Sequence, residues 1–377
     1  MPRRFIPVCE VALEGRELNY VTRAVKSGWI SSSGEYVNAF ERRFARFCGQ
    51  RHAVGVCNGT MALHLALVAL GVGRGDEVII PDFTMIASAF AVCYTGATPV
   101  FVDAEPDTWN MDADRIEEKI GPKTKAIMPV SIFAHPCDMD KIRRLARRHR
   151  LSVVEDAAES HGSRYRGRKT GSLADITTFS FYANKNLTTG EGGMVVTDDR
   201  RLYERAIYFR NMCFSLDGVR DYVHRDIGFN YRMTNLTAAV GLAQVEKADE
   251  YIRRRIQNGE WYRRYLSEIP GIIFQQKRPD VVQATWMNGL VVDSGVFGRT
   301  RDELAAYLKK KGIDTRLFFT GMHRQPSLLN YGCDGSGRYP VSNRLTKHGL
   351  YLPSSVLLRE KDIRSICRTI AAFRRLN

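Results

Sequence analysis

Seven short runs of β-branched and apolar residues alternate with helical patterns over the first 200 residues of this 377-residue chain. Between the runs lie amphipathic stretches that glycines close, such as "VNAFERRFARFCG" and "TMALHLALVALG". The runs themselves are "HAVGVC", "DEVIIP", "TPVFVD", "KAIMPV", "LSVVED", "ITTFSF" and "GMVVTD". Strands that alternate with helices predict an α/β fold, with a mostly parallel central sheet and helices on both of its faces.

A second domain is expected because the chain is too long for one ordinary hydrophobic core. The pattern changes near residue 236, where the long helical stretch "LTAAVGLAQVEKADEYIRRRIQNGEWYRRYLSEIPG" begins. It is followed by the strand-like "GLVVD", the helical "TRDELAAYLKKKG" and a final helix near 361–375. We therefore expect a large domain over 1–248 and a smaller α+β domain over 249–377.

The formal net charge of +15 is compatible with nucleic acid, a membrane surface or an anionic small substrate. Basic residues cluster in "KIRRLARRHR" and "YIRRRIQNGEWYRRYL", where apolar residues recur at near-helical spacing. This pattern is typical of the solvated face of an ordinary helix, and no nucleic-acid-binding signature accompanies it. We expect no nucleic-acid partner.

Membrane and metal functions are not indicated either. No apolar run reaches the length of a membrane helix, and the start "MPRRFIPVCEVALEG" lacks the apolar region of a secretory signal. The eight cysteines form no C-x-x-C pair, so reduced and mostly buried thiols are expected. We predict a cytoplasmic protein without a metal site.

Ligands of open parallel sheets bind at the carboxyl ends of the strands, so the polar residues there are the first candidates. Asn58, Gly59 and Thr60 separate the strand "HAVGVC" from a helix, whose free N–H groups would bind an anion. Such junctions are common, and alone this signal is weak. The "GVGRGD" stretch follows a helix and precedes a strand, which excludes it as a phosphate loop, and neither a P-loop nor a Rossmann motif occurs.

Two further strand ends carry ionisable residues. Asp156 and Glu159 follow "LSVVE", and Lys185 follows "TTFSFYAN". The plain alternatives are a helix cap for the carboxylate and a surface position for the lysine. Desolvation between two buried strands would instead lower the pKa of the lysine and make it a nucleophile, with Ser180 placed to share the anion.

The three strand ends together meet the requirements of pyridoxal 5'-phosphate (PLP). The phosphate needs a helix N-terminus, the pyridine nitrogen needs an acidic partner, and the aldehyde needs a lysine. This combination is more specific than any of its parts.

Motifs along nearly the whole chain resemble those of the DegT/DnrJ/EryC1/StrS family of sugar-nucleotide aminotransferases, which have the fold type I (aspartate aminotransferase-like) architecture. They are "SGWISSSGEYVNAFERRFA", "NGTMALHLAL", "VVEDAAESHG", "FSFYANKNLTTGEGGMV", "NYRMTNLTAAVGLAQ", "TRLFFTGMHRQP" and "GLYLPS". The resemblance implies a PLP enzyme with a pyridoxamine 5'-phosphate form, in which Lys185 binds the aldehyde and Asp156 pairs with the ring nitrogen. It further implies the following positions: Glu159 near the ring hydroxyl, Gly59, Thr60 and Ser180 on the phosphate, and Met85 against the ring.

By the same resemblance Asn235 would reach the phosphate of a neighbouring subunit, which implies a homodimer with shared active sites. Relatives that dehydrate sugars carry histidine in place of Lys185, so this lysine favours amine transfer. Two positions depart from the family pattern: Met85 replaces an aromatic residue, and Ser131 replaces a histidine. Both departures leave substrate details open.

The implied reaction moves an amino group from L-glutamate to the keto group of a nucleotide-linked 4-keto-6-deoxy sugar. The start "GWISS", Glu159 and the "HPCDMD" segment most resemble members that aminate C4 of GDP-4-keto-6-deoxymannose. Ser31, Ser32, Arg316 and His323 are the expected substrate-binding residues. The nucleotide (GDP, UDP or dTDP), amination at C3 or C4, a dehydratase and a non-catalytic PLP-fold regulator remain open alternatives.

Overall fold

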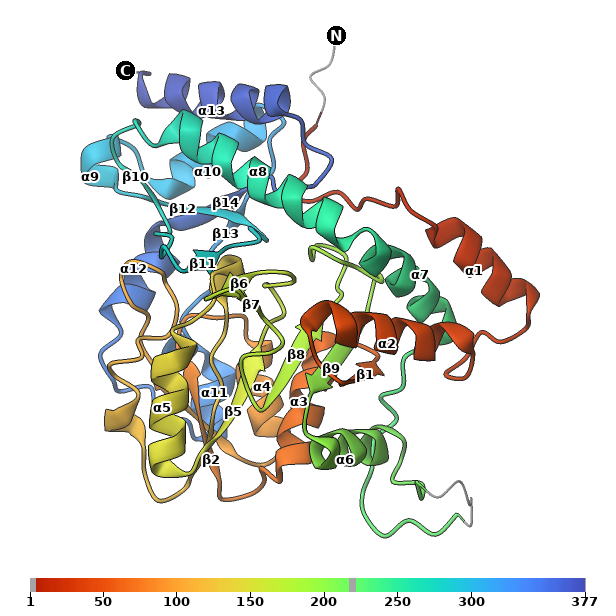
Figure 1. The fold of residues 1–377 in the computed structure, drawn as a ribbon. Coiled ribbons are helices and arrows are strands. Elements are labelled where there is room, and N and C mark those ends of the chain that lie inside the picture. Colours follow the sequence, from red (N-terminus) through yellow and green to blue (C-terminus); the bar gives the residue numbers. More distant parts are fainter. Residues whose placement is uncertain (1–4, 217–221, 377) are drawn as a thin grey trace.

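The computed structural model describes residues 5–216 and 222–376 of the chain. Figure 1 shows a lower body built on a large sheet, an upper lobe built on a smaller sheet, and a helical arm at one side. The α/β prediction with a smaller C-terminal α+β part is confirmed.

The central sheet has seven strands in the order β1-β9-β8-β5-β4-β2-β3. Strands β2, β3, β4, β5 and β8 pair in parallel, and β9 runs antiparallel to both of its neighbours. Their bounds are β1 His52–Val56, β2 Glu77–Pro81, β3 Thr98–Val102, β4 Thr124–Ile127, β5 Ser152–Asp156, β8 Ile176–Ser180 and β9 Gly193–Thr197. Each of the seven predicted runs therefore forms a strand of this sheet.

Helices cover both faces of the central sheet because alternate residues of each strand point to opposite sides. Val78 and Ile80 belong to the hydrophobic cluster beneath α3, α4 and α6, whereas Ile79 belongs to the cluster beneath α5. These helices are α3 Gly59–Leu70, α4 Ala87–Tyr94, α5 Met139–His149 and α6 Arg200–Arg210. The cluster on "KIRRLARRHR" lies on α5, whose buried residues are apolar, as expected for a solvated helix face.

The side arm consists of α1 Glu17–Lys26, α2 Glu35–Cys48 and α7 Asn235–Glu246, and α7 packs against both of the others (Figure 1). Phe40 and Phe44 of α2 are buried against Phe181 from the end of β8. The long helical stretch predicted from residue 236 is divided. Helix α7 ends before Lys247, and α8 Ala248–Leu266 continues into the upper lobe.

The upper lobe is built on a four-stranded antiparallel sheet in the order β10-β12-β14-β13. Its elements are β10 Ile272–Phe274, β12 Asn288–Val292, β13 Arg316–Leu317, β14 Gly349–Leu352, α9 Ser294–Phe297, α10 Arg301–Lys310, α12 Pro340–His348 and α13 Glu360–Arg374. Helix α11 Pro326–Tyr331 lies instead in the lower body, where Leu328 joins the hydrophobic cluster of α3 and α4 (Figure 1). A three-stranded ribbon joins the two parts; its strands are β6 Arg164–Tyr165, β7 Arg168–Lys169 and β11 Val281–Val282. Short 3-10 turns cover Glu117–Lys119, Ile132–Ala134 and Met322–Arg324. The N-terminal segment runs beside this lobe, where Ile6 bridges to Ile313. The domain boundary at 248 stays a prediction.

In the part of the chain that the structure describes, no helix combines the length and the apolar character needed to cross a membrane. The same residues contain no group of three or more histidine, cysteine or acidic side chains placed to hold a metal ion. All eight cysteines are free thiols.

Candidate active site

The N-terminus of α3 meets the end of β8 at the carboxyl edge of the central sheet. Asn58 caps α3 by accepting a 2.9 Å hydrogen bond from the Met61 N–H. A Cβ atom built on Gly59 would lie 2.6 Å from Cβ of Ser180, so only glycine allows this approach. The first N–H groups of α3 thus lie beside the Ser180 hydroxyl, an arrangement that suits an anion.

Alanine at position 59 is expected to damage this cradle. The added methyl group would have to displace Ser180, and overpacking of this kind costs about 2 kcal/mol, which corresponds to about 30-fold weaker PLP binding. Titration of the apoprotein with PLP measures the effect. Gly73→Ala is the matched control, because a Cβ there has no atom within 4 Å. Equal PLP affinity of Gly59→Ala and Gly73→Ala would contradict the cradle.

Asp156 ends β5 with its carboxylate buried and only 4% of the residue exposed. One oxygen accepts a 2.8 Å hydrogen bond from the Ser88 hydroxyl, and the other accepts from the Ala158 N–H at 3.1 Å. Burial raises the pKa of Asp156, and these donors together with the nearby Lys185 amine oppose the rise. The result is an oriented acidic group that can pair with a cationic ring nitrogen.

Glu159 lies in the turn after β5 and is 3% exposed. Its carboxylate accepts a 2.7 Å hydrogen bond from the Phe133 N–H, and burial raises its pKa to about 7 despite the lowering by Lys185. Phe133 and Ala134 both have positive φ angles, of 49° and 71°. Non-glycine residues rarely adopt this conformation, and strain of this kind concentrates at functional sites.

Lys185 faces both carboxyl groups. Burial lowers the pKa of its amine, and the negative charges of Glu159 and Asp156 oppose the shift. Its Nζ atom lies 3.8 Å from the centroid of the Trp286 ring. The amine is therefore held inside the molecule, beside the acid that ends β5.

Two aromatic residues of this site were not among the predicted ones. Trp286 precedes β12 and Tyr351 lies in β14, and both are part of an aromatic cluster with Phe133. The pKa of Tyr351 is raised to about 12 by burial and by the charge of Glu159, which places its hydroxyl near that carboxylate. No motif at either position signals this role, because the contact depends on how the second sheet packs on the first.

Of the two departures from the family pattern, Ser131 lies beside Asp156, and Met85 is exposed. Met85 stands three residues before Ser88 and is 49% exposed. The Ser131 N–H donates to the Asp156 carbonyl at 3.2 Å, and its hydroxyl is buried without a hydrogen-bond partner among the described residues. Met85 can thus reach a ligand, whereas Ser131 lies behind the site.

Asn235, expected to reach a neighbouring subunit, is instead engaged within its own chain. Its side-chain oxygen accepts from the Tyr36 N–H at 2.9 Å, and its amide donates to the Trp29 carbonyl at 2.6 Å. The residue is only 1% exposed. These contacts disfavour the predicted role, and Asn230 is the exposed amide of the same segment.

The predicted substrate residues are not brought together. Ser31 and Ser32 lie in the loop between α1 and α2, where the Ser31 carbonyl accepts from the Asn235 N–H. Arg316 lies in β13 opposite Tyr351, which places it on the side of Glu159, and it forms an ion pair with Asp314.

His323 anchors the turn before α11 to the central sheet. Its Nδ1 atom lies 2.8 and 2.9 Å from the two oxygens of Asp82, which is fully buried at the end of β2. Its ring also stacks on Tyr339 with centroids 4.4 Å apart. Nucleotide binding by His323 stays a prediction, since these contacts account for its position.

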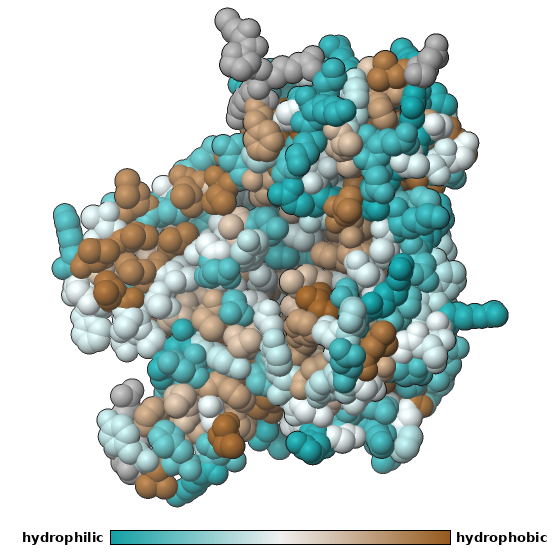
Figure 2. All heavy atoms as spheres, turned by 180° about the vertical axis from the view of Figure 1, so that it is seen from behind, coloured by the Kyte–Doolittle hydropathy of each residue, from teal (hydrophilic) through white to brown (hydrophobic). Residues whose placement is uncertain are grey.

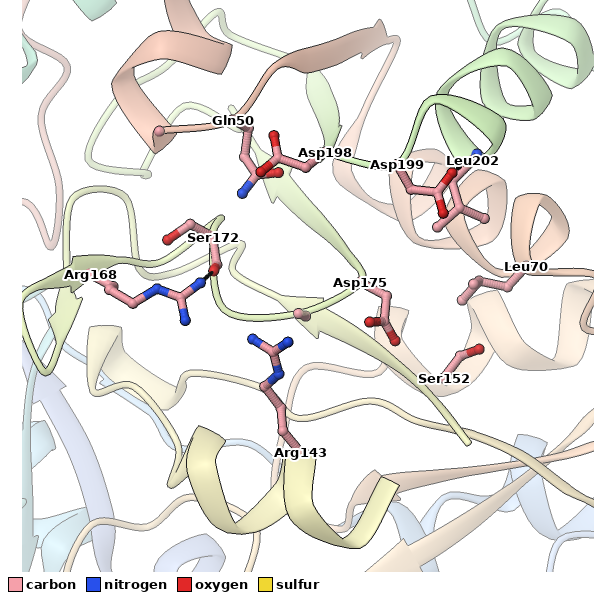
Figure 3. Close-up of a pocket in the computed structure, with 12 residues that line it drawn as sticks. Gln50, Leu70, Arg143, Ser152, Arg168, Ser172, Asp175, Asp198, Asp199 and Leu202 are labelled. Atoms are coloured by element: carbon pink, nitrogen blue, oxygen red, sulfur yellow. Dashed lines mark hydrogen bonds between the residues drawn. The ribbon is translucent and has the colours of Figure 1, made fainter. Parts of the chain in front are cut away.

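A separate hollow of about 590 Å³ lies at the opposite edge of the sheet, near the start of β5 (Figure 3). Its polar side chains serve the surrounding loops: Arg143 donates to the Leu173 carbonyl, and Asp175 accepts from the Val153 N–H at 2.8 Å. Asp199 caps α6. Lys185, Asp156 and Glu159 do not line this hollow, so the volume of a hollow does not identify the functional site.

Comparison with known proteins identifies the family of this chain. The sequence profile of the DegT/DnrJ/EryC1/StrS aminotransferase family matches residues 12–371. The chain belongs to this family. It is 43% identical over 370 residues to GDP-perosamine synthase of Escherichia coli O157:H7, covering 98% of this chain and 99% of that protein. It is 44% identical over 377 residues to GDP-perosamine synthase of Caulobacter vibrioides, covering 99% and 98%.

Among solved structures, DesV of S. venezuelae, in complex with a ketimine intermediate, superposes with a TM-score of 0.92 at 34% identity, covering 99% of this chain and 100% of that chain. This member of the family is accordingly a PLP-dependent aminotransferase with the type I fold. The residues present fit the cofactor. The close approach of Gly59 to Ser180 brings the N-terminus of α3 beside the Ser180 hydroxyl, which suits a phosphate, and the buried Asp156 suits a protonated pyridine nitrogen.

Proposed function

We propose that this aminotransferase moves the amino group of L-glutamate to C4 of GDP-4-keto-6-deoxymannose, which is the reaction of a GDP-perosamine synthase. The observation that carries the proposal is the convergence of Lys185, Asp156 and Glu159 on one buried site at the sheet edge. Full-length similarity to two GDP-perosamine synthases supports the choice of substrate.

The roles of the site residues follow from their positions. PLP, when bound, supplies an aldehyde for attachment and a ring that withdraws electrons once its nitrogen is protonated. With the cofactor bound, Asp156 would hold that proton on the ring nitrogen, and Glu159 would be the acidic group for the ring hydroxyl. The Lys185 amine would accept the proton from the α-carbon of glutamate and donate it back to complete the transfer.

The remaining positions complete the proposed site. Gly59, Thr60 and Ser180 bind the phosphate through the N-terminus of α3. Met85 would offer its thioether to the ring. Arg316 binds the anionic nucleotide. It lies beside Tyr351 on the side of Glu159, and its side chain is partly exposed to solvent although it pairs with Asp314.

A homodimer with shared sites is part of the proposal. Figure 2 shows apolar side chains gathered on the helical arm and on the projecting part below it. The exposed residues of these regions include Leu13, Leu18, Val25, Trp29, Ile30, Leu216, Tyr222 and Ile227. Contiguous apolar surface of this kind marks an interface. Sedimentation of the holoenzyme should give twice the 42.7 kDa mass of one chain, and an active monomer would contradict sharing.

The substrate is tested with purified protein, PLP and a panel of GDP-, UDP- and dTDP-linked ketosugars. With L-glutamate we expect release of 2-oxoglutarate and an amino sugar from the GDP-linked 4-keto-6-deoxymannose. The kcat/KM should be about 100-fold above that for the other nucleotides, because unpaired polar groups in the site penalise the wrong base. Preferential turnover of another nucleotide, or loss of a hydroxyl without amine transfer, would reject the assignment.

A further inference from the structure

Trp286 follows a residue whose backbone conformation is strained. Thr285, immediately before it, has a φ angle of 43°. A positive φ is a genuine outlier for a β-branched residue, and such strain persists only where the surroundings enforce it. Arg255 donates to the Trp286 carbonyl at 3.0 Å, and the ring is 3% exposed.

Two hydrogen bonds join residues 284–286 to the turn that carries Lys185, one on each side of the lysine. The Trp286 Nε1–H donates to the carbonyl of Asn184 at 2.9 Å, and the Asn186 side chain donates to the carbonyl of Ala284 at 3.1 Å. Asn184 and Asn186 flank Lys185 in the chain. The indole and the lysine are therefore fixed relative to each other.

We propose that the face of Trp286 is the resting place of the free Lys185 amine and stabilises its ammonium form. The Nζ atom lies 3.8 Å from the ring centroid, a distance at which an ammonium is attracted by the electron-rich face of an indole. Trp286 is thus a positioning residue that acts through the lysine. The inference builds on the proposed role of Lys185 as the group that accepts a proton.

Other charges around the amine do not depend on Trp286. Asp156 and Glu159 face it from the turn after β5, together with the neutral imidazole of His161, whose pKa burial lowers to about 3. Tyr351 from β14 faces Glu159, and Arg316 lies beside Tyr351 in the neighbouring strand β13. Removing the indole takes away its π face and its Nε1–H bond to the Asn184 carbonyl, and leaves these charged groups in the site.

Two rates are expected to respond in opposite directions in Trp286→Leu. Covalent uptake of PLP by the apoprotein requires the neutral amine, and loss of the indole face lowers the pKa of the amine because its ammonium form loses a favourable contact. Uptake at neutral pH should become about 3- to 10-fold faster, with its pH midpoint shifted downward. The single-turnover reaction of the holoenzyme with L-glutamate should become about 10-fold slower. In this step Lys185 accepts a proton, and its ammonium form would no longer be stabilised by the indole face.

Matched variants separate positioning from packing. Trp286→Phe keeps a weaker π face and should lie between wild type and Trp286→Leu in both rates. Trp109→Leu removes another buried indole of the same aromatic cluster, which contacts Phe133 and Phe318, and should move the two rates together or not at all. A joint fall or no change of both rates in Trp286→Leu would overturn the inference. Absence of covalent PLP uptake in wild type would instead reject the role of Lys185 itself.

Discussion

Lys185→Ala is expected to fold, to bind PLP only weakly and without a covalent bond, and to lose amine transfer by about 10⁴-fold or more. The alanine removes both the nucleophile that attaches the cofactor and the base that moves the proton, and proton transfer by a positioned group alone contributes up to about 10⁴-fold. In wild type, borohydride should bleach the yellow colour and leave the cofactor mass on the peptide that contains residue 185. The variant should show no such mass increase.

Lys169→Ala is the control for this experiment. Lys169 is also partly buried and also lies over an aromatic ring, with Nζ 3.9 Å from the centroid of Phe47, but it lies on the β6–β7 ribbon. This variant should keep its colour, its borohydride-fixed cofactor and its rate. Wild-type turnover by Lys185→Ala would refute the active site described above.

The central sheet could be predicted from the sequence because its signal is local. Strands buried on both faces read as short continuous apolar runs, and all seven were visible as such. The break between α7 and α8 was not visible, since the apolar pattern continues through Lys247. There the two helices separate because α7 packs against α1 and α2 whereas α8 packs against α13, which is a property of the tertiary structure.

The site was predictable only where it depends on strand ends. Parallel strands bring their carboxyl ends to one edge, so Gly59, Asp156 and Lys185 could be expected to meet. Trp286 immediately precedes β12 of the second sheet and Tyr351 lies in β14, about 100 residues or more further along the chain, and no local pattern marks them.

The inward orientation of Asn235 was likewise beyond prediction from sequence. A Cβ built on Gly34 would lie 2.3 Å from Cγ of Asn235, so the close approach of these two segments decides where the amide points. Sequence spacing shows neither the approach nor the two backbone groups of Tyr36 and Trp29 that the amide binds.

Asp156→Asn is expected to bind PLP and to slow the half-reaction with L-glutamate by about 10³-fold. The carboxylate is buried, and Ser88 and Ala158 already orient it. Breaking a buried charge pair costs about 3 to 5 kcal/mol, which corresponds to about 10² to 10⁴ in rate when the pair stabilises the transition state. Asparagine keeps the shape but cannot hold the proton on the ring nitrogen, so PLP affinity should fall much less than the rate.

Glu155→Gln tests whether any buried carboxylate at the end of β5 supports the half-reaction, or only the carboxylate of Asp156. Glu155 is fully buried on the opposite face of the strand, where it accepts from the Gly171 N–H at 3.0 Å, and burial raises its pKa to about 7. Because the folded state binds this proton more tightly than the unfolded state, the carboxyl destabilises the protein increasingly as pH rises from about 4.5 towards 7. Glu155→Gln should therefore raise the melting temperature at pH 8, have little effect near pH 4.5, and leave the half-reaction unchanged. If it slowed the half-reaction as much as Asp156→Asn, the ring-nitrogen role of Asp156 would have to be abandoned, because two carboxylates on opposite faces of one strand cannot both touch the same ring.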